Sequence, residues 1–427
     1  MDIDSSNRTR SGNGVDFNNN KSIILVFQHI TSTSKKMTIA YTTHKATGLP
    51  IPDADTLLDE YPMANYFREN LRPGLIELLK ANAEDTLMNE NGLQRNLYNI
   101  RDDLERLKSI LDDRARHPEI AEVEIKQPLF ILGLPRCGTS LLHALMESDP
   151  SVRAPLQWEI AYPSPPPEAA TATIDPRIDQ YEAYLRAQLG GDYKELIKGH
   201  PLGPMIPQEC GSFMTSSFQS TNPCMMSSLP GYYNWVLNTD VSFRYEVHKM
   251  WLQQLGWRNP GQHWVLKIQE HMYKLPELLS VYPDAIFIQP HRDPNSVIAS
   301  ISQLIQVIRE PAYDNIDSHA LGHELLHLWW DGIKCMMDYR SAHPELPIYD
   351  MRFKDLVKDP VATVAAAYEH FGWEFSDAAA KGIVAWLDEN PVDKHGKRTY
   401  SLEEFGLNTD TIQHVFTEYS RRYADYI

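Results

Sequence analysis

The fold of this chain is decided by the stretch PLFILGLPRCGTSLLHALME at residues 128–147. Residues 128–134 form a short apolar run, which is typical of a parallel strand buried on both faces. A turn rich in glycine and proline follows, and residues 140–147 have the composition of a helix. A strand, a glycine turn and a helix in this order present backbone N–H groups and a positive helix end to an anion. The stretch therefore predicts an anion-binding loop.

The identity of that anion is narrowed by the residues of the loop. Residues 133–138 fit Gly-x-x-x-x-Gly, and Thr139 stands where a nucleotide triphosphatase would carry lysine. The loop's cation is instead Arg136. The loop therefore keeps the backbone arrangement that binds an anion but lacks the lysine and magnesium chemistry of ATP hydrolysis. A 5′-phosphosulfate suits such a loop, with charge from Arg136 and hydroxyls from Thr139 and Ser140. The alternative is an ordinary glycine turn before a helix.

Further strands and helices alternate along the rest of the chain, which predicts a parallel α/β sheet. Residues 54–115 are helical in pattern and predict an N-terminal helical cap, whereas the proline-rich residues 150–167 predict a loop. The other predicted strands cover residues 263–267, 285–289 and 347–352, and the other predicted helices cover residues 295–308, 318–341, 360–371 and 376–388.

Composition limits the possible partners and location. The chain has 427 residues and a net charge of −17, which argues against a nucleic-acid partner. Its four cysteines form no Cys-x-x-Cys pair, so we expect a reducing compartment without a disulfide framework or a cysteine-rich zinc site. The apolar runs fall well short of the roughly 20 residues that span a bilayer. These features predict a cytoplasmic protein without a membrane span; a homo-oligomer is compatible with them.

A second anion site is indicated at residues 285–300, AIFIQPHRDPNSVIAS, where a predicted strand ends just before Arg292 and a helix carries Ser300. With both elements in this order, the chain from about residue 125 onward resembles the PAPS-dependent sulfotransferase superfamily (PAPS is 3′-phosphoadenosine 5′-phosphosulfate). It is similar to the broad bacterial and eukaryotic branch related to the tyrosylprotein sulfotransferases. In that superfamily Pro-Arg-x-Gly-Thr-Ser/Thr binds the 5′-phosphosulfate, and Arg-Asp followed by Ser binds the 3′-phosphate.

The resemblance implies a P-loop-like three-layer fold with a central parallel sheet flanked by helices. It implies PAPS as co-substrate, adenosine 3′,5′-bisphosphate as product, and no metal. The Asn-, Ser- and Thr-rich residues 1–36 themselves predict a disordered tail, and residues 37–124 predict a helical region. The resemblance assigns residues 125–427 to a sulfotransferase domain, in which the aromatic-rich residues at about 160–260 are expected to form a substrate-facing insertion. The implied donor-binding residues are Arg136, Cys137, Gly138, Thr139, Ser140, Leu141, Arg292 and Ser300.

Two segments match the superfamily less well. Relatives often carry a basic glycine-containing segment that closes over the nucleotide, and residues 394–403 with Lys397 and Arg398 resemble it. A solvated basic loop is an equal alternative. Relatives often read Leu-Lys-Ser-Pro-x-His where this chain has Leu-Lys-Ile-Gln-Glu-His at 266–271, which leaves the path of that loop open.

The chemistry requires charge stabilisation and a general base. Arg136 and Lys267 are expected to stabilise the leaving 5′-phosphate and the sulfuryl oxygens. Glu159 occupies the position of the catalytic glutamate of the tyrosylprotein type and is the first candidate for the base. The rival candidates are His200, His271 and Glu209.

A competing motif lies at His323-Glu324-Leu-Leu-His327, the pattern of a zinc metallopeptidase, with Glu345 as a possible third ligand. The alternative is an amphipathic core helix. A third hypothesis is a non-catalytic nucleotide-binding module. The acceptor has no motif, but the aromatic residues between about 170 and 260 suggest a small apolar or aromatic molecule that carries a hydroxyl or an amine. Core and interface packing explains most of these aromatic residues better.

Overall fold

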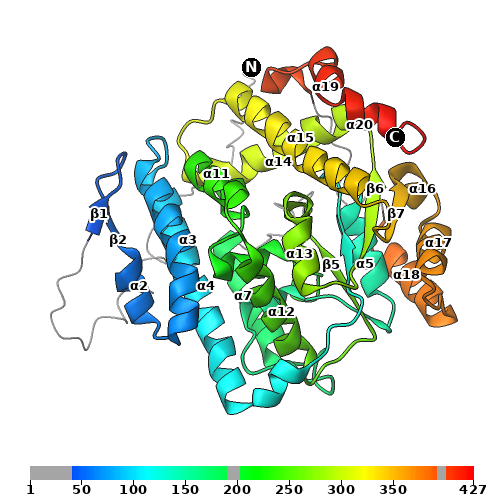
Figure 1. Cartoon of the computed structure of the whole chain (residues 1–427), viewed down its shortest axis with the longest axis horizontal. Helices are drawn as coiled ribbons and strands as arrows, with labels where there is room; N and C mark the ends of the chain where they lie inside the picture. The colour runs from blue at the N-terminus through cyan, green and yellow to red at the C-terminus, as the bar shows by residue number, and fades with distance from the viewer. Residues whose placement is uncertain (1–40, 190–201, 392–400) are drawn as a thin grey trace, which may run out of the picture. The chain divides into compact units, whose positions relative to one another are not determined.

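The structure is a computed structural model, and it describes residues 41–189, 202–391 and 401–427. The tail predicted at 1–36 lies outside the described residues. Residues 41–427 form one compact unit with a central sheet and surrounding helices (Figure 1).

Five parallel strands form the central sheet, in the order β4-β5-β3-β6-β7. β3 lies in the middle, and its three residues are buried as the apolar run requires. Ile131 pairs with Lys267 on one side and with Ile288 on the other, so the carboxyl ends of these strands meet at one edge of the sheet. The strands are β3 (Leu129–Ile131), β4 (Val152–Arg153), β5 (His263–Lys267), β6 (Ile286–His291) and β7 (Ile348–Arg352).

Helices cover both faces of the sheet, and the alternation of side chains along β3 divides the core. Phe130 points into one hydrophobic cluster, whereas Leu129 and Ile131 point into another. The first cluster packs against α12 (Ser242–Gly256), α13 (Leu275–Val281), α14 (Pro294–Arg309) and α15 (Ser318–Ala342). The second packs against α5 (Thr139–Glu147), α16 (Phe353–Lys358), α17 (Pro360–Phe371) and α18 (Asp377–Glu389). The predicted three-layer α/β fold is thereby confirmed.

The N-terminal helices share the first cluster with the sheet. Leu75 and Leu104 are fully buried in the same cluster as Phe130, so the predicted helical cap is confirmed as part of this core. The domain boundary at 124/125 stays a prediction. This region contains the hairpin β1 (Tyr41–Thr43) and β2 (Pro50–Pro52), then α2 (Ala54–Glu60), α3 (Asn65–Glu84), α4 (Glu90–Arg116) and the single turn η1 (Pro118–Glu122).

The prediction of a loop at 150–167 is wrong in part, because the segment contains β4 and α6 (Gln157–Ala161). β4 is an edge strand of two residues that pairs with His263 and Trp264. α6 is a single turn. Elements this short have no periodicity that a sequence could reveal.

The described residues between α6 and β5 contain several helices. Their elements are α7 (Pro176–Leu189), α9 (Gly211–Met214), η2 (Thr215–Ser217), α10 (Pro223–Met226), α11 (Pro230–Asn238) and α12. The remaining elements are η3 (Gln269–Tyr273), η4 (Glu310–Ala312), η5 (Glu403–Phe405), α19 (Thr409–Val415) and α20 (Thr417–Arg422). Within the described ranges, no helix combines the length and the apolar character needed to cross a bilayer.

Candidate active site

The loop between β3 and α5 has an unusual backbone. Gly133, Arg136 and Gly138 have φ angles of 102°, 61° and 82°, all in the left-handed region. For Arg136 this conformation costs about 1–2 kcal/mol, so the surrounding contacts must hold it. A Cβ on Gly138 would lie 2.9 Å from the ring of Phe353. Successive turns of this kind direct N–H groups into one concavity, ahead of the first turn of α5.

Arg136 and Arg292 bring the two predicted anion sites together. The Arg136 Nε donates a 3.0 Å hydrogen bond to the Ser300 Oγ. The Arg292 Nη1 donates a 2.7 Å hydrogen bond to the backbone carbonyl of Arg136. The guanidinium of Arg292 also lies 4.4 Å from the centre of the Phe353 ring. The loop and the start of α14 therefore form one cationic region.

A pocket of about 470 Å³ opens beside Arg292 at the N-terminal end of α14. A helix start with polar side chains and an arginine is suited to a phosphate group. Residues 401–403, which end the predicted basic segment, form its other wall, while Lys397 and Arg398 lie outside the described residues. The pocket is lined by Arg292, Asn295, Ser296, Ala299, Ser401, Leu402 and Glu403.

Lys267 is directed at the loop from the end of β5. Its side chain is only 2% exposed, and Nζ donates a 2.8 Å hydrogen bond to the Ser140 Oγ. The same Nζ is ion-paired with Glu209. Gln269, which stands where relatives often carry the proline of Ser-Pro, donates to the Thr139 Oγ1 at 3.3 Å. The departure from the family pattern at 266–271 therefore preserves contact between this segment and the loop.

Cys137 and Leu141 direct their side chains away from the anion cradle. The Cys137 side chain is fully buried in the first core cluster, and burial raises the pKa of its thiol to about 12. Leu141 packs against the second cluster. What these two residues can offer an anion is therefore their backbone N–H.

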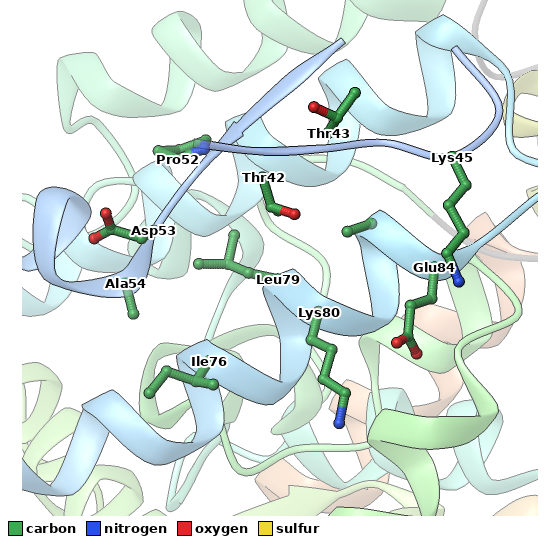
Figure 2. A pocket seen from close by; sticks show the side chains of 11 residues that line it. Thr42, Thr43, Lys45, Pro52, Asp53, Ala54, Ile76, Leu79, Lys80 and Glu84 are labelled. Carbon is green, nitrogen blue, oxygen red and sulfur yellow. The ribbon is translucent and has the colours of Figure 1, made fainter. Parts of the chain in front are cut away.

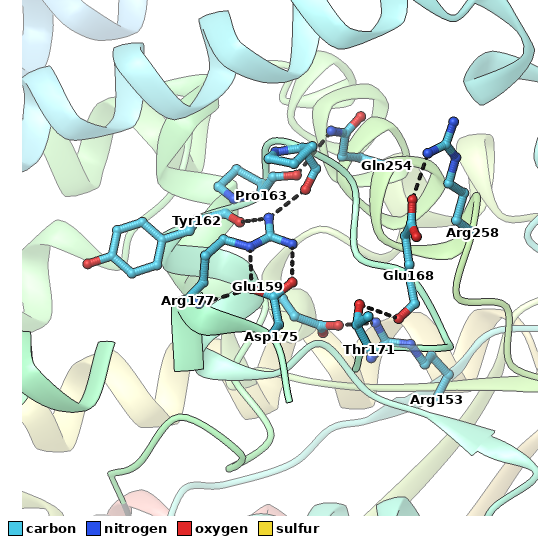
Figure 3. Close-up of polar contacts among 11 residues, drawn as sticks. Arg153, Glu159, Tyr162, Pro163, Glu168, Thr171, Asp175, Arg177, Gln254 and Arg258 are labelled. Atoms are coloured by element: carbon cyan, nitrogen blue, oxygen red, sulfur yellow. Dashed lines mark hydrogen bonds and ion pairs between the residues drawn. The ribbon is translucent and has the colours of Figure 1, made fainter. Parts of the chain in front are cut away.

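Glu159 is held in a buried ion pair. It is 0% exposed and accepts a 2.5 Å hydrogen bond from the Arg153 Nη2 (Figure 3). It accepts another of 2.9 Å from the backbone N–H of Leu156. The second bond caps α6. Both carboxylate oxygens are thus engaged in contacts that position this part of the chain.

The other candidates for the base differ in their surroundings. His271 is fully buried, shares a 3.0 Å hydrogen bond with Tyr245, and has its pKa lowered well below the usual value by burial. His200 lies outside the described residues. Glu209 has a side chain that is 25% exposed, and it contacts Lys267 directly. Glu209 is one of the rival candidates for the base, and no motif surrounds it in the sequence. It lies at the loop because the Cys210 N–H bonds to the Lys267 carbonyl at 3.0 Å, a contact that the sequence does not reveal.

The zinc-peptidase motif is not assembled into a metal site within the described parts of the chain. His323 and His327 are exposed on α15, and Glu324 is ion-paired with Arg309 at 2.7 Å. Glu345 pairs with His343 instead. Among the described residues, one group of potential metal ligands lies close together: Cys210, His248 and His271, whose ligand atoms are within 4.8 Å of one another. Both of these histidines also bond a tyrosine hydroxyl through Nδ1.

A second pocket, of about 340 Å³, lies between the β1–β2 hairpin and α3 (Figure 2). None of the predicted site residues line it. Its walls contain Thr42, Thr43, Lys45, Pro52, Asp53, Ala54, Ile76, Leu79, Lys80, Ala83 and Glu84.

Comparison with known proteins assigns the family. Residues 128–377 match the sulfotransferase family, over more than half of the chain. The chain belongs to the sulfotransferase family. The matched range contains the loop, Lys267, Arg292 and Ser300, so the family expected from the two anion motifs is confirmed.

Named relatives of this chain come from mycobacteria. An omega-hydroxy-beta-dihydromenaquinone-9 sulfotransferase, Stf3, of Mycobacterium bovis is 26% identical over 269 residues. The match covers 59% of this chain and 65% of that protein. Stf3 of Mycobacterium tuberculosis matches to the same extent.

Two solved structures share the fold. Sulfotransferase STF9 from Mycobacterium avium has a TM-score of 0.78 and 24% identity, and covers 87% of this chain and 97% of its own. Sulfotransferase STF1 from Mycobacterium tuberculosis has a TM-score of 0.75 and 26% identity, with 86% and 97% coverage. The fold therefore extends well beyond the residues matched by the family.

Proposed function

We propose that this sulfotransferase moves the sulfuryl group of PAPS to a hydroxyl or an amine of a small, largely apolar acceptor. The observation that supports PAPS most strongly is the contact between Arg292 and Arg136, which joins two anion sites into one region. PAPS carries a 5′-phosphosulfate and a separate 3′-phosphate, and the two sites match these two groups. When bound, it supplies the sulfuryl group as a mixed anhydride with phosphate.

The residues present fit such a donor. The left-handed loop and the N-terminus of α5 would hold the 5′-phosphosulfate, with Arg136, Thr139 and Ser140 contributing charge and hydroxyls. Arg292, Ser300 and the pocket at α14 would hold the 3′-phosphate. Lys397 and Arg398 stay candidates for covering the nucleotide. No divalent ion is needed, because lysine and arginine neutralise the charge that develops on the leaving phosphate.

We propose Glu209 as the general base in preference to Glu159. Glu209 is partly exposed and touches Lys267, whereas Glu159 has both oxygens engaged at a buried capping site. Glu209 would take the proton of the acceptor hydroxyl, and Lys267 would turn from Glu209 to the sulfuryl oxygens. In this step the acceptor oxygen forms a bond to the sulfur and its proton passes to Glu209. The bond between the sulfur and the bridging oxygen breaks, and that oxygen leaves with the phosphate.

The proposed acceptor side is a third apolar cluster that lies beside Glu209. Its buried members are Leu156, Trp158, Tyr181 and Leu185, on and around α6 and α7. The segment leading to Glu209 runs along this cluster, because Gln208 N–H bonds to the Pro155 carbonyl at 2.7 Å. Met205 in that segment is 41% exposed. An apolar acceptor agrees with the menaquinone derivative named for Stf3.

The donor assignment is tested by ligand-dependent stability. Adenosine 3′,5′-bisphosphate should raise the melting temperature of the full chain, since a ligand that binds only the folded state stabilises it. ATP with magnesium should raise it much less. An equal response to the two ligands, or a response to neither, would refute the donor assignment. A cytoplasmic location and the absence of a nucleic-acid partner stay predictions.

A further inference from the structure

A chain of hydrogen bonds leads from the donor site to the C-terminal helix. His291, the last residue of β6, is fully buried and immediately precedes Arg292. Its Nε2 lies 2.8 Å from the Asp350 Oδ1, and its Nδ1 lies 3.0 Å from the hydroxyl of Tyr419 in α20. The backbone of the proposed 3′-phosphate arginine is thus flanked by residues from two other elements.

The direction of each bond follows from the charge of Asp350. Arg340 donates two hydrogen bonds of 2.8 Å to this carboxylate. Burial opposes ionisation, but these bonds and the one from His291 hold the pKa of Asp350 at about 2. An ionised carboxylate can only accept, so the His291 Nε2 carries the proton and donates it. Burial lowers the pKa of His291, which keeps the ring neutral, and its Nδ1 therefore accepts from the Tyr419 hydroxyl.

The Tyr419 hydroxyl therefore donates its proton to His291, the residue that directly precedes Arg292. Tyr419 is 0% exposed, and burial raises its pKa well above the usual value, so the hydroxyl stays protonated. The residue next to Arg292 is therefore tied by a hydrogen bond to a side chain 128 positions further along the sequence, and the backbone of Arg292 is held through it.

Tyr423 provides an internal comparison. Its ring lies 4.2 Å from the ring of His291 and is 3% exposed, so it packs in the same cluster as Tyr419. Its buried hydroxyl, however, has no hydrogen-bond partner among the described residues. The two tyrosines therefore pack in the same cluster, but only Tyr419 of the two has a hydrogen bond through its hydroxyl. Comparing Phe variants of both separates the effect of this hydrogen bond on donor binding from the effect of packing.

We propose that Tyr419 is a positioning residue for the donor site, through which the C-terminal helix α20 fixes the backbone of Arg292 for the 3′-phosphate. This inference rests on the proposed function, because it takes Arg292 as the 3′-phosphate ligand. Tyr419 itself touches neither reacting group. It acts by holding Arg292 where its guanidinium reaches both the pocket and the carbonyl of Arg136.

The test measures the affinity of the full chain for adenosine 3′,5′-bisphosphate and for adenosine 5′-monophosphate, which lacks the 3′-phosphate. Tyr419→Phe should weaken binding of the bisphosphate about three- to tenfold, the range for one lost hydrogen bond. It should leave binding of the monophosphate within about twofold. Tyr423→Phe should leave both affinities within about twofold, because no hydrogen bond is lost.

Two outcomes would overturn the inference: equal effects of Tyr419→Phe and Tyr423→Phe, or equal weakening of both ligands by Tyr419→Phe. The second outcome would show a merely structural role. If Tyr419→Phe does not fold, Asp350→Asn takes its place, since it perturbs the same chain of bonds from its far end, with the same ligand discrimination expected. Failure of the unaltered chain to bind the bisphosphate would instead refute the proposed function, and this inference with it.

Discussion

The guanidinium of Arg292 is bonded to the backbone carbonyl of Arg136, 156 positions away in the sequence. This bond helps to hold Arg136 in its left-handed conformation and joins the loop after β3 to the loop after β6. A guanidinium has several N–H donors, so it can bond a carbonyl and a phosphate at the same time. Arg292 therefore couples the two halves of the proposed donor site.

Arg292→Lys should therefore weaken adenosine 3′,5′-bisphosphate binding by about tenfold to a hundredfold, since lysine keeps the charge and loses the fork. Calorimetry of the purified variant checks this. Arg421→Lys, at an exposed position of α20, is the matched control and should bind as the unaltered chain does. Undiminished binding by Arg292→Lys would show that the several N–H donors of the arginine are not needed to bind the ligand.

Gly138→Ala should be more destabilising than Gly372→Ala. Both glycines have positive φ angles, so both substitutions carry the cost of the left-handed backbone, about 1–2 kcal/mol. A Cβ at 138 would in addition meet the Phe353 ring at 2.9 Å, whereas a Cβ at 372 meets nothing within 4 Å. Urea unfolding of both variants measures the difference. Equal losses of unfolding free energy in the two variants would mean that the Phe353 ring can move away from the added Cβ without destabilising the fold.

Glu209→Gln should lower kcat by about a hundredfold or more, as loss of a general base does, and should cost less stability than Glu159→Gln, because Glu209 is 25% exposed and Lys267 keeps its bond to Ser140. Glu159→Gln should do the reverse, because breaking a buried ion pair with Arg153 costs about 3–5 kcal/mol of stability. Turnover and denaturant unfolding of both variants distinguish the two carboxylates. A normal kcat for Glu209→Gln together with a specific loss for a folded Glu159→Gln would restore Glu159 as the base.

His143 should make the fold sensitive to acid. Burial, with a smaller contribution from Lys267, lowers the pKa of this histidine to about 4, below the value of 6.5 in an unfolded chain. Between these values the unfolded state binds a proton that the folded state does not. Stability is therefore complete above pH 6.5 and is lost as the pH falls toward 4, by up to about 1.4 kcal/mol per pH unit.

His143→Gln can still donate to the Val265 carbonyl, which His143 contacts at 3.1 Å, but it does not titrate. Its free energy of unfolding should fall less between pH 7 and pH 5 than that of the unaltered chain. Some dependence of the free energy of unfolding on pH should remain in the variant, because the buried His248 and His271 also have lowered pKa values. Parallel pH profiles for the variant and the unaltered chain would contradict this account of His143.

The sequence predicted the central sheet because β3, β5 and β6 each contain an apolar run and the strands, β7 included, alternate with turns and helices. It could not reveal β4 or α6, which depend on the edge of β5 and on the capping of Leu156 by Glu159. The anion loops were predictable since their residues are contiguous. Glu209 and Tyr419 were not, because each reaches the site through contacts with distant parts of the chain.

The central claim, transfer of a sulfuryl group from PAPS, is tested most directly with ³⁵S-labelled PAPS and a panel of apolar hydroxyl compounds that includes omega-hydroxylated isoprenoid quinones. We expect a labelled sulfate ester with at least one acceptor, and its loss in Arg136→Ala, which removes the cation of the loop. Labelled product that persists undiminished in Arg136→Ala would contradict the site. Binding of PAPS without transfer to any acceptor would contradict the activity and indicate a nucleotide-binding module instead.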